Sequence, residues 1–164
     1  MRVAIVSDTH MPRGPRRLPD ACVERLREAD AILHAGDLIR VEVLELLEAI
    51  GPPVHAIAGN VDDAAVRAKL PDTRVVELGG ARIGMVHDPG RKEGRLARLR
   101  DRFRDADAVV YGHTHMPEHL TDPQTGFQAF NPGSPTERRR APGHTMGLAT
   151  VAADGALTFE LVAV

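Results

Sequence analysis

The chain has 164 residues, of which 43% are hydrophobic and 27% charged, so we expect one globular domain over 1–164 with a core of its own. Its net charge of −2 gives no general attraction to nucleic acid or membranes, and no stretch reaches the roughly 20 apolar residues of a membrane span. The single cysteine excludes an internal disulfide, and the first predicted strand leaves no room for a signal peptide, so we expect a cytoplasmic protein.

The first half of the chain alternates strands with helices. Short apolar runs predict strands at 3–7, 31–36 and 54–59, and helical spacing predicts helices at 19–29, 41–50 and about 63–69. Strands separated by helices indicate crossover connections, and these favour a parallel sheet.

The second half is dominated by strands. The pattern predicts a hairpin at 74–78 and 81–87, a charged helix at roughly 93–104, and strands at 108–112, 127–131, 145–153 and 156–164. The stretch 133–144, rich in Arg, Pro and Gly, is predicted to be an exposed loop. Two sheets with helices outside would accommodate this order, and no interdomain linker is evident.

Polar side chains recur where the predicted strands end. They are Asp8, His10, Asp37, Asn60, His87, His113 and His115. Ligands of open α/β sheets gather at the carboxyl ends of strands, so these side chains are expected to converge. Carboxylates and imidazoles without a thiolate suit Mn, Fe, Co, Ni or Zn. A cation would compensate the cost of burying Asp8 and His10 beside the first strand.

The ordered set D-x-H, G-D, G-N, H and G-H-x-H resembles the calcineurin-like metallophosphoesterase superfamily. The stretches SDTH, LHAGD, AGNVD, YGHTH and NPGS, with the chain length, resemble its small bacterial and archaeal phosphodiesterase branch. The resemblance runs from residue 2 to the end of the chain. It implies an α/β fold, a four-layer α-β-β-α sandwich with two mixed β-sheets.

The same resemblance implies a catalytic site for two divalent metal ions, with manganese preferred over Ni, Fe, Co or Zn. Asp8, His10 and His115 would hold one ion, Asn60, His87 and His113 the other, and Asp37 would bridge both. Two ions about 3.5–4 Å apart can share a hydroxide that attacks phosphorus in line. We therefore expect a metal-dependent hydrolase, a phosphodiesterase or phosphatase that acts on small phosphoesters.

Two positions depart from the pattern of the wider superfamily. Val61 follows Asn60, where many members carry the histidine thought to protonate the leaving group; the small branch also tends to lack it. Asp62 is the first candidate for this general acid and His119 the second, although either could be a surface residue. Asp88 stands where glycine is expected, and it either hydrogen-bonds a ligand or starts a turn.

Several other residues leave two interpretations open. His34 is either a support for a metal ligand or a buried structural histidine. Arg13, with Arg16 and Arg17, either binds substrate phosphate or lies in a solvated loop. The run 138–140 is expected to be a solvated loop, and the NPGS stretch 131–134 a turn that supports the site.

Two functions compete with a small-molecule phosphoesterase. One is a scaffold, as in a retromer subunit of the superfamily that has lost key ligands, but His87, His113 and His115 are all present here. The other is a nuclease, but five aromatic residues, mostly in predicted strands, offer no base-stacking platform. We therefore expect a small phosphoester substrate, no specific nucleic-acid or membrane partner, and leave a homo-oligomer open.

Overall fold

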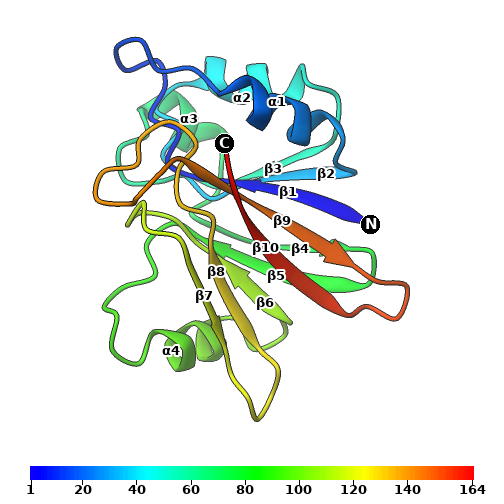
Figure 1. The fold of residues 1–164 in the computed structure, drawn as a ribbon. Helices are drawn as coiled ribbons and strands as arrows, with labels where there is room; N and C mark the ends of the chain where they lie inside the picture. Colours follow the sequence, from blue (N-terminus) through cyan, green and yellow to red (C-terminus); the bar gives the residue numbers. More distant parts are fainter.

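The computed structural model describes residues 1–164, which form ten strands and four helices (Figure 1). The strands are β1 (Arg2–Val6), β2 (Ala31–His34), β3 (Val54–Ala56), β4 (Thr73–Leu78), β5 (Ala81–Val86), β6 (Ala108–Val110), β7 (Glu118–Thr121), β8 (Gln128–Asn131), β9 (Thr145–Val151) and β10 (Leu157–Ala163). The helices are α1 (Asp20–Arg27), α2 (Val41–Glu48), α3 (Ala64–Lys69) and α4 (Arg95–Arg102). None of these helices is long and apolar enough to cross a membrane.

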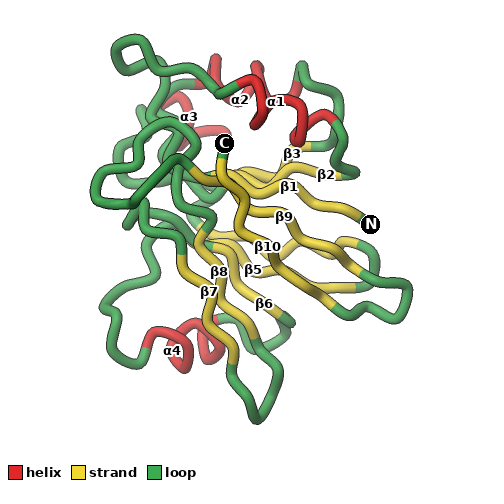
Figure 2. Tube along the Cα trace, viewed as in Figure 1, coloured by secondary structure: helices red, strands yellow, loops and turns green.

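The strands form two mixed sheets of five. The first has the order β10-β9-β1-β2-β3, in which β1, β2 and β3 are parallel and β9 runs antiparallel to β1 and β10. The second has the order β4-β5-β6-β8-β7, with β5, β6 and β8 parallel. Helices α1 to α3 cover the outside of the first sheet and α4 the outside of the second (Figure 2). The predicted four-layer sandwich is therefore confirmed.

Strand β1 shows why the sheets pack in this way. Val3 and Ile5 point into the layer between the sheets, where Ile83 and Met85 of β5 also lie. The alternate residues Ala4 and Val6 belong to the layer under the helices. A strand buried on both faces needs apolar residues at every position, and this accounts for the unbroken apolar run.

The structure differs from the sequence prediction at β7 and at the strand ends. Strand β7 was not predicted, because its sequence EHLT is polar; it lies at the edge of the second sheet and is only half-buried. The strand predicted at 31–36 ends at His34, because Gly36 and Asp37 leave the extended conformation with φ of 93° and 60°. The apolar run thus continues past the last paired residue of β2 into the loop that carries Asp37.

Candidate metal centre

The loops after β1, β2, β5 and β6 meet at one end of the sandwich. The backbone N–H of Asp8 donates to Gly36 O and that of His10 to Asp37 O, which joins the loops after β1 and β2. The N–H of Gly112 donates to His87 O and joins the loops after β5 and β6. Side chains that are far apart in the sequence are therefore held at a common point, as the sequence predicted.

Backbone strain is concentrated in these loops. Five of the seven predicted ligands have a positive φ between 45° and 70°: Asp8, His10, Asp37, His113 and His115. This region is uncommon for residues other than glycine and costs on the order of 1–3 kcal/mol at each position. Such conformations persist only where the surrounding structure imposes them, and they are typical of ligand and catalytic sites.

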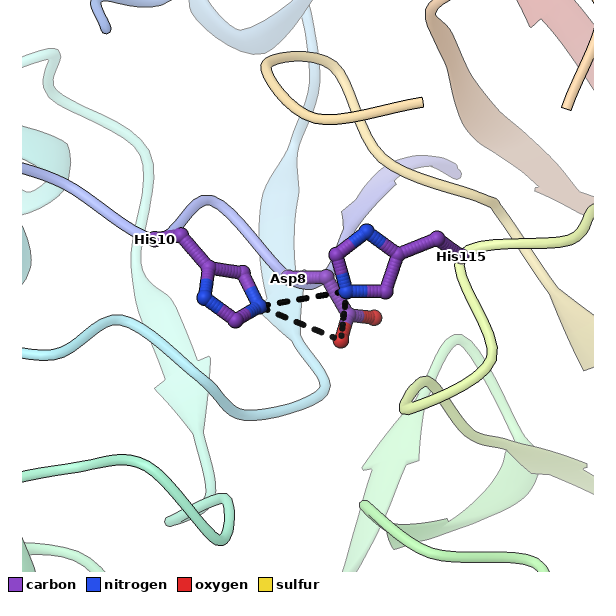
Figure 3. Close-up of side chains that lie close together, drawn as sticks. All are labelled: Asp8, His10 and His115. Carbon is purple, nitrogen blue, oxygen red and sulfur yellow. Dashed lines mark hydrogen bonds and ion pairs between the residues drawn. The ribbon is translucent and has the colours of Figure 1, made fainter. Parts of the chain in front are cut away.

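Asp8, His10 and His115 form one buried cluster (Figure 3). Asp8 Oδ1 lies 3.2 Å from His115 Nε2 and 3.8 Å from His10 Nε2, and the two Nε2 atoms are 3.2 Å apart. All three side chains are fully buried. Three electron-pair donors thus converge on one small, buried volume.

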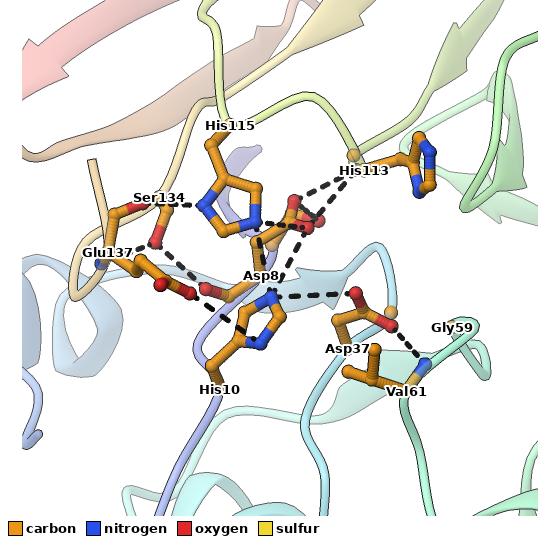
Figure 4. A network of polar contacts seen from close by, with 12 residues as sticks. Asp8, His10, Asp37, Gly59, Val61, His113, His115, Ser134 and Glu137 are labelled. Atoms are coloured by element: carbon orange, nitrogen blue, oxygen red, sulfur yellow. Dashed lines mark hydrogen bonds and ion pairs between the residues drawn. The ribbon is translucent and has the colours of Figure 1, made fainter. Parts of the chain in front are cut away.

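A second buried cluster consists of Asp8, Asp37 and His87. Asp37 Oδ2 lies 3.5 Å from His10 Nε2 of the first cluster (Figure 4) and 3.2 Å from His87 Nε2 of the second, so one carboxylate oxygen stands between the two clusters. This is the location expected of a bridging ligand. The structure also places Asp8 in both clusters, whereas the sequence analysis assigned it to one ion.

Asn60 and His113 adjoin the second cluster on its more open side. Asn60 Oδ1 is 3.1 Å from His87 Nε2 and 2.8 Å from His113 Nδ1. His113 itself is half-buried. All seven predicted ligands therefore lie in one continuous set of contacts, and Asn60, whose side chain is exposed, is nearest to solvent.

The hydrogen bonds of two histidines show that the site fits a cation. His115 Nδ1 lies 2.6 Å from Glu137 O, and His87 Nδ1 lies 2.8 Å from Ala35 O. A carbonyl oxygen only accepts, so each Nδ1 carries a proton, and in the neutral ring each Nε2 presents a lone pair to a carboxylate. Lone pairs that face carboxylate oxygens repel unless a cation lies between them. The donor set is therefore able to hold a divalent metal ion.

The pKa directions reflect the same arrangement. Burial acts to raise the pKa of Asp8, but its contacts with His10 and His115 outweigh burial and hold that pKa well below its usual range. Burial acts to lower the pKa of His87, but the carboxylates of Asp37 and Asp8 outweigh it and raise that pKa. The cluster thus favours anionic carboxylates and positive charge between them.

His34 and the NPGS turn hold the ligand loops in place. Buried His34 accepts the N–H of Gly36 at Nδ1 and contacts Thr9 Oγ1 through Nε2, and burial lowers its pKa to about 4, so it stays neutral. Ser134 Oγ donates to Asp8 O, and Asn131 Nδ2 donates to Gly112 O. The predicted supporting turn is confirmed, although 132–135 are buried, so the loop 133–144 is exposed only in part.

Both candidate general acids are engaged in other hydrogen bonds. The buried carboxylate of Asp62 accepts the backbone N–H groups of Asp37, Ile39 and Gly59 at 3.2, 2.5 and 2.6 Å. Both carboxylate oxygens are thus engaged by backbone N–H groups from the loops after β2 and β3. His119 lies on β7, bonded to the side chain of Gln128. Asp62 therefore positions the loops of the site, and its part as general acid stays a prediction.

The structure places the two other open positions in loops, and one residue near the site was not predicted. Asp88 accepts the N–H of Gly90 and starts a turn, while the Arg13 side chain is exposed, with only its backbone N–H bonded to His10 O. Glu137 was not predicted from the sequence. Its Oε2 lies 3.6 Å from His10 Nδ1, and neither atom has another partner. No local pattern around Glu137 marks this contact, which depends on the fold.

Replacing Gly59 by alanine is expected to disrupt the site. A Cβ on Gly59 would lie 2.1 Å from Asp37 Oδ1 and 2.3 Å from Asp37 N, far inside contact distance. The Asp37 loop would have to move, so we expect bound metal per chain to fall by at least half, measured by elemental analysis. Gly126→Ala is the control, because nothing lies within 4 Å of that Cβ, although its own positive φ adds strain. Unchanged metal content in Gly59→Ala would contradict the packing argument.

Comparison with known proteins decides the family. The model of the calcineurin-like phosphoesterase superfamily domain matches residues 1–154. The chain belongs to this superfamily. A protein of Methanothermobacter thermautotrophicus, described as a probable metallophosphoesterase, is 34% identical over 143 residues, 85% of this chain and 80% of that protein. The family predicted from the sequence is therefore confirmed.

Solved structures share the superfamily fold. Vps29 from Entamoeba histolytica, determined in complex with Zn²⁺, is 25% identical, with a TM-score of 0.77 over 99% of each chain. A structure described as a novel archaeal phosphodiesterase has a TM-score of 0.73 at 19% identity, covering 99% of this chain and 100% of that one. The second likeness concerns the fold alone.

Proposed function

We propose that this chain is a phosphodiesterase that uses two divalent cations, with manganese preferred, to hydrolyse small phosphoesters. The observation that carries the proposal is the pair of buried donor clusters, with Asp37 Oδ2 between their imidazoles. Membership of the metallophosphoesterase superfamily supports hydrolysis, and the fold shared with an archaeal phosphodiesterase favours a diester over a monoester.

Each side chain has a physical part in this proposal. Asp8, His10 and His115 would hold one cation at the fully buried end, where protein atoms exclude bulk water. Asn60, His87 and His113 would hold the other at the more open end, and Asp37 would bridge both. Neutral imidazole and amide ligands leave the loaded site with a net positive charge, which attracts a phosphate. When bound, such a metal pair lowers the pKa of water towards neutrality and neutralises charge on phosphoryl oxygens.

The purified protein is expected to hydrolyse bis(p-nitrophenyl) phosphate and to lose that activity on exhaustive chelation. The reason is that the proposed nucleophile is water, and two bound cations would lower its pKa towards neutrality. Release of p-nitrophenolate measures the rate, with Mn, Co, Ni, Fe and Zn restored in turn to the chelated protein. Full activity after verified removal of metal would contradict the mechanism.

A scaffold is the second candidate function, favoured by the likeness to Vps29. The complete ligand set argues against it, since binding a partner does not require seven converging donors. The hydrolysis panel distinguishes the two: a folded, metal-loaded protein that cleaves no mono- or diester would support the scaffold instead.

A further inference from the structure

Two arginine-rich loops lie beside the donor clusters, and their arginines are not among the proposed ligands. The loop between β1 and α1 carries Arg13, Arg16 and Arg17, and the loop between β8 and β9 carries Arg138, Arg139 and Arg140. We call these six residues the arginine rim. Five of them are exposed and Arg16 is half-buried. The chain as a whole carries −2, so this basic surface contrasts with an acidic remainder.

The two loops form one surface although they are far apart in the sequence. Arg16 Nη2 donates to Glu137 Oε1 at 2.8 Å, and Thr136 Oγ1 donates to Thr9 O at 2.6 Å. In Figure 1 the dark-blue loop and the orange loop occupy the end of the sandwich at which β1 and β2 terminate. The two loops that carry the six arginines therefore meet at one end of the molecule.

This surface begins at the proposed ligands. Arg139 Nη1 lies within 3.5 Å of His113 O, and the backbone carbonyl of Glu137 accepts from His115 Nδ1 (Figure 4). On the other loop, the backbone N–H of Arg13 donates to His10 O. Three of the four proposed ligand histidines thus contact a loop of the arginine rim.

Most of this positive charge is not neutralised within the chain. Arg16 pairs with Glu137, whereas no carboxylate lies within 4.0 Å of the other five guanidinium groups. Arg139 also has a positive φ of 47°. The other residues besides glycine with positive φ are five proposed ligands and Ile39, which is two residues from Asp37. Strain of this kind is typical of ligand-binding positions.

We propose that the arginine rim binds a second phosphate group of the substrate, so that the substrate class is small phosphoesters that carry a further phosphate. The proposal rests on the proposed function for the scissile phosphate. The proposed metal ions would already neutralise that group, and five guanidinium groups without a carboxylate partner exceed what one phosphate requires. The planar guanidinium fork matches phosphate oxygens through paired N–H donors, and it keeps its charge at every physiological pH.

The test compares thymidine 5′-(p-nitrophenyl phosphate) with its 3′-phosphorylated form, which differ only in the second phosphate. We expect kcat/KM to be at least about tenfold higher for the phosphorylated form, mainly through a lower KM. In the double variant Arg139→Gln/Arg140→Gln this ratio should fall towards one. The control Arg27→Gln/Arg82→Gln removes two exposed arginines from α1 and β5 and should leave the ratio unchanged.

Direct binding separates this proposal from the proposed function. Calorimetry on the metal-loaded protein should give thymidine 3′,5′-bisphosphate at least about tenfold higher affinity than thymidine 5′-monophosphate, with the difference reduced by salt. Hydrolysis of both substrates at equal kcat/KM would overturn the arginine rim and leave the phosphodiesterase intact. If neither substrate is hydrolysed but the difference in affinity remains, the phosphodiesterase proposal fails and the arginine rim stands. A difference that survives in the Arg139→Gln/Arg140→Gln variant would also overturn the arginine rim.

Discussion

Replacing Asp37 by alanine is expected to remove metal from both proposed positions and to lower kcat by on the order of 1,000-fold or more. Asp37 Oδ2 lies within 3.5 Å of imidazoles from both clusters, so its loss leaves each cation without a shared anionic ligand. Metal ions contribute several kcal/mol of transition-state stabilisation, and each 1.36 kcal/mol is a factor of ten in rate. Elemental analysis and hydrolysis of bis(p-nitrophenyl) phosphate provide the two measurements.

His87→Ala and Asp105→Ala provide the comparison. His87 lies at the second cluster, so its loss should mainly reduce occupancy of one position. Asp105 is an exposed aspartate that precedes β6, at the opposite end of that strand from His113 and His115, and its loss should change neither metal content nor rate. Unaltered metal stoichiometry in Asp37→Ala would show that Asp37 is not the bridge. Equal losses in Asp37→Ala and His87→Ala would show that the two positions fill cooperatively.

Much of the fold and the convergence of the site could be predicted from the sequence. Apolar runs mark strands buried on both faces, and the polar residues that end them mark where the chain leaves the sheet. Strand β7 escaped prediction because an edge strand needs no apolar run, and its pairing with β8 depends on a neighbour seven or more residues away. Local pattern is informative where burial is complete and weak where one face meets solvent.

The residues that support the ligands were harder to predict. Asp62 was interpreted as a proton donor because it lies two residues after Asn60, yet its partners are backbone groups of loops after β2 and β3. Glu137 contacts His10 across more than a hundred residues of sequence. Such roles depend on which loops meet in space, and a single sequence contains no signal for them.

The rate of hydrolysis is expected to depend steeply on the pKa of the leaving group. Val61 occupies the position where many superfamily members carry histidine, and Asp62 and His119 are both bonded elsewhere. General acid catalysis typically contributes on the order of 100–10,000-fold, and an alkoxide needs it far more than p-nitrophenolate does. Aryl phosphodiesters of graded leaving-group pKa should therefore show a continuous fall in kcat/KM, with alkyl esters slowest.

The variant Asp62→Asn separates a proton donor from a positioning residue. An amide has one acceptor oxygen for three N–H donors, so we expect a lower melting temperature and a loss of about 2 kcal/mol or more in stability. The dependence on leaving-group pKa should keep its wild-type slope, because the substitution removes no acid. Asp105→Asn should alter neither property. A flat dependence in the wild type that becomes steep in Asp62→Asn would identify Asp62 as the acid, provided that chemistry rather than product release limits the rate.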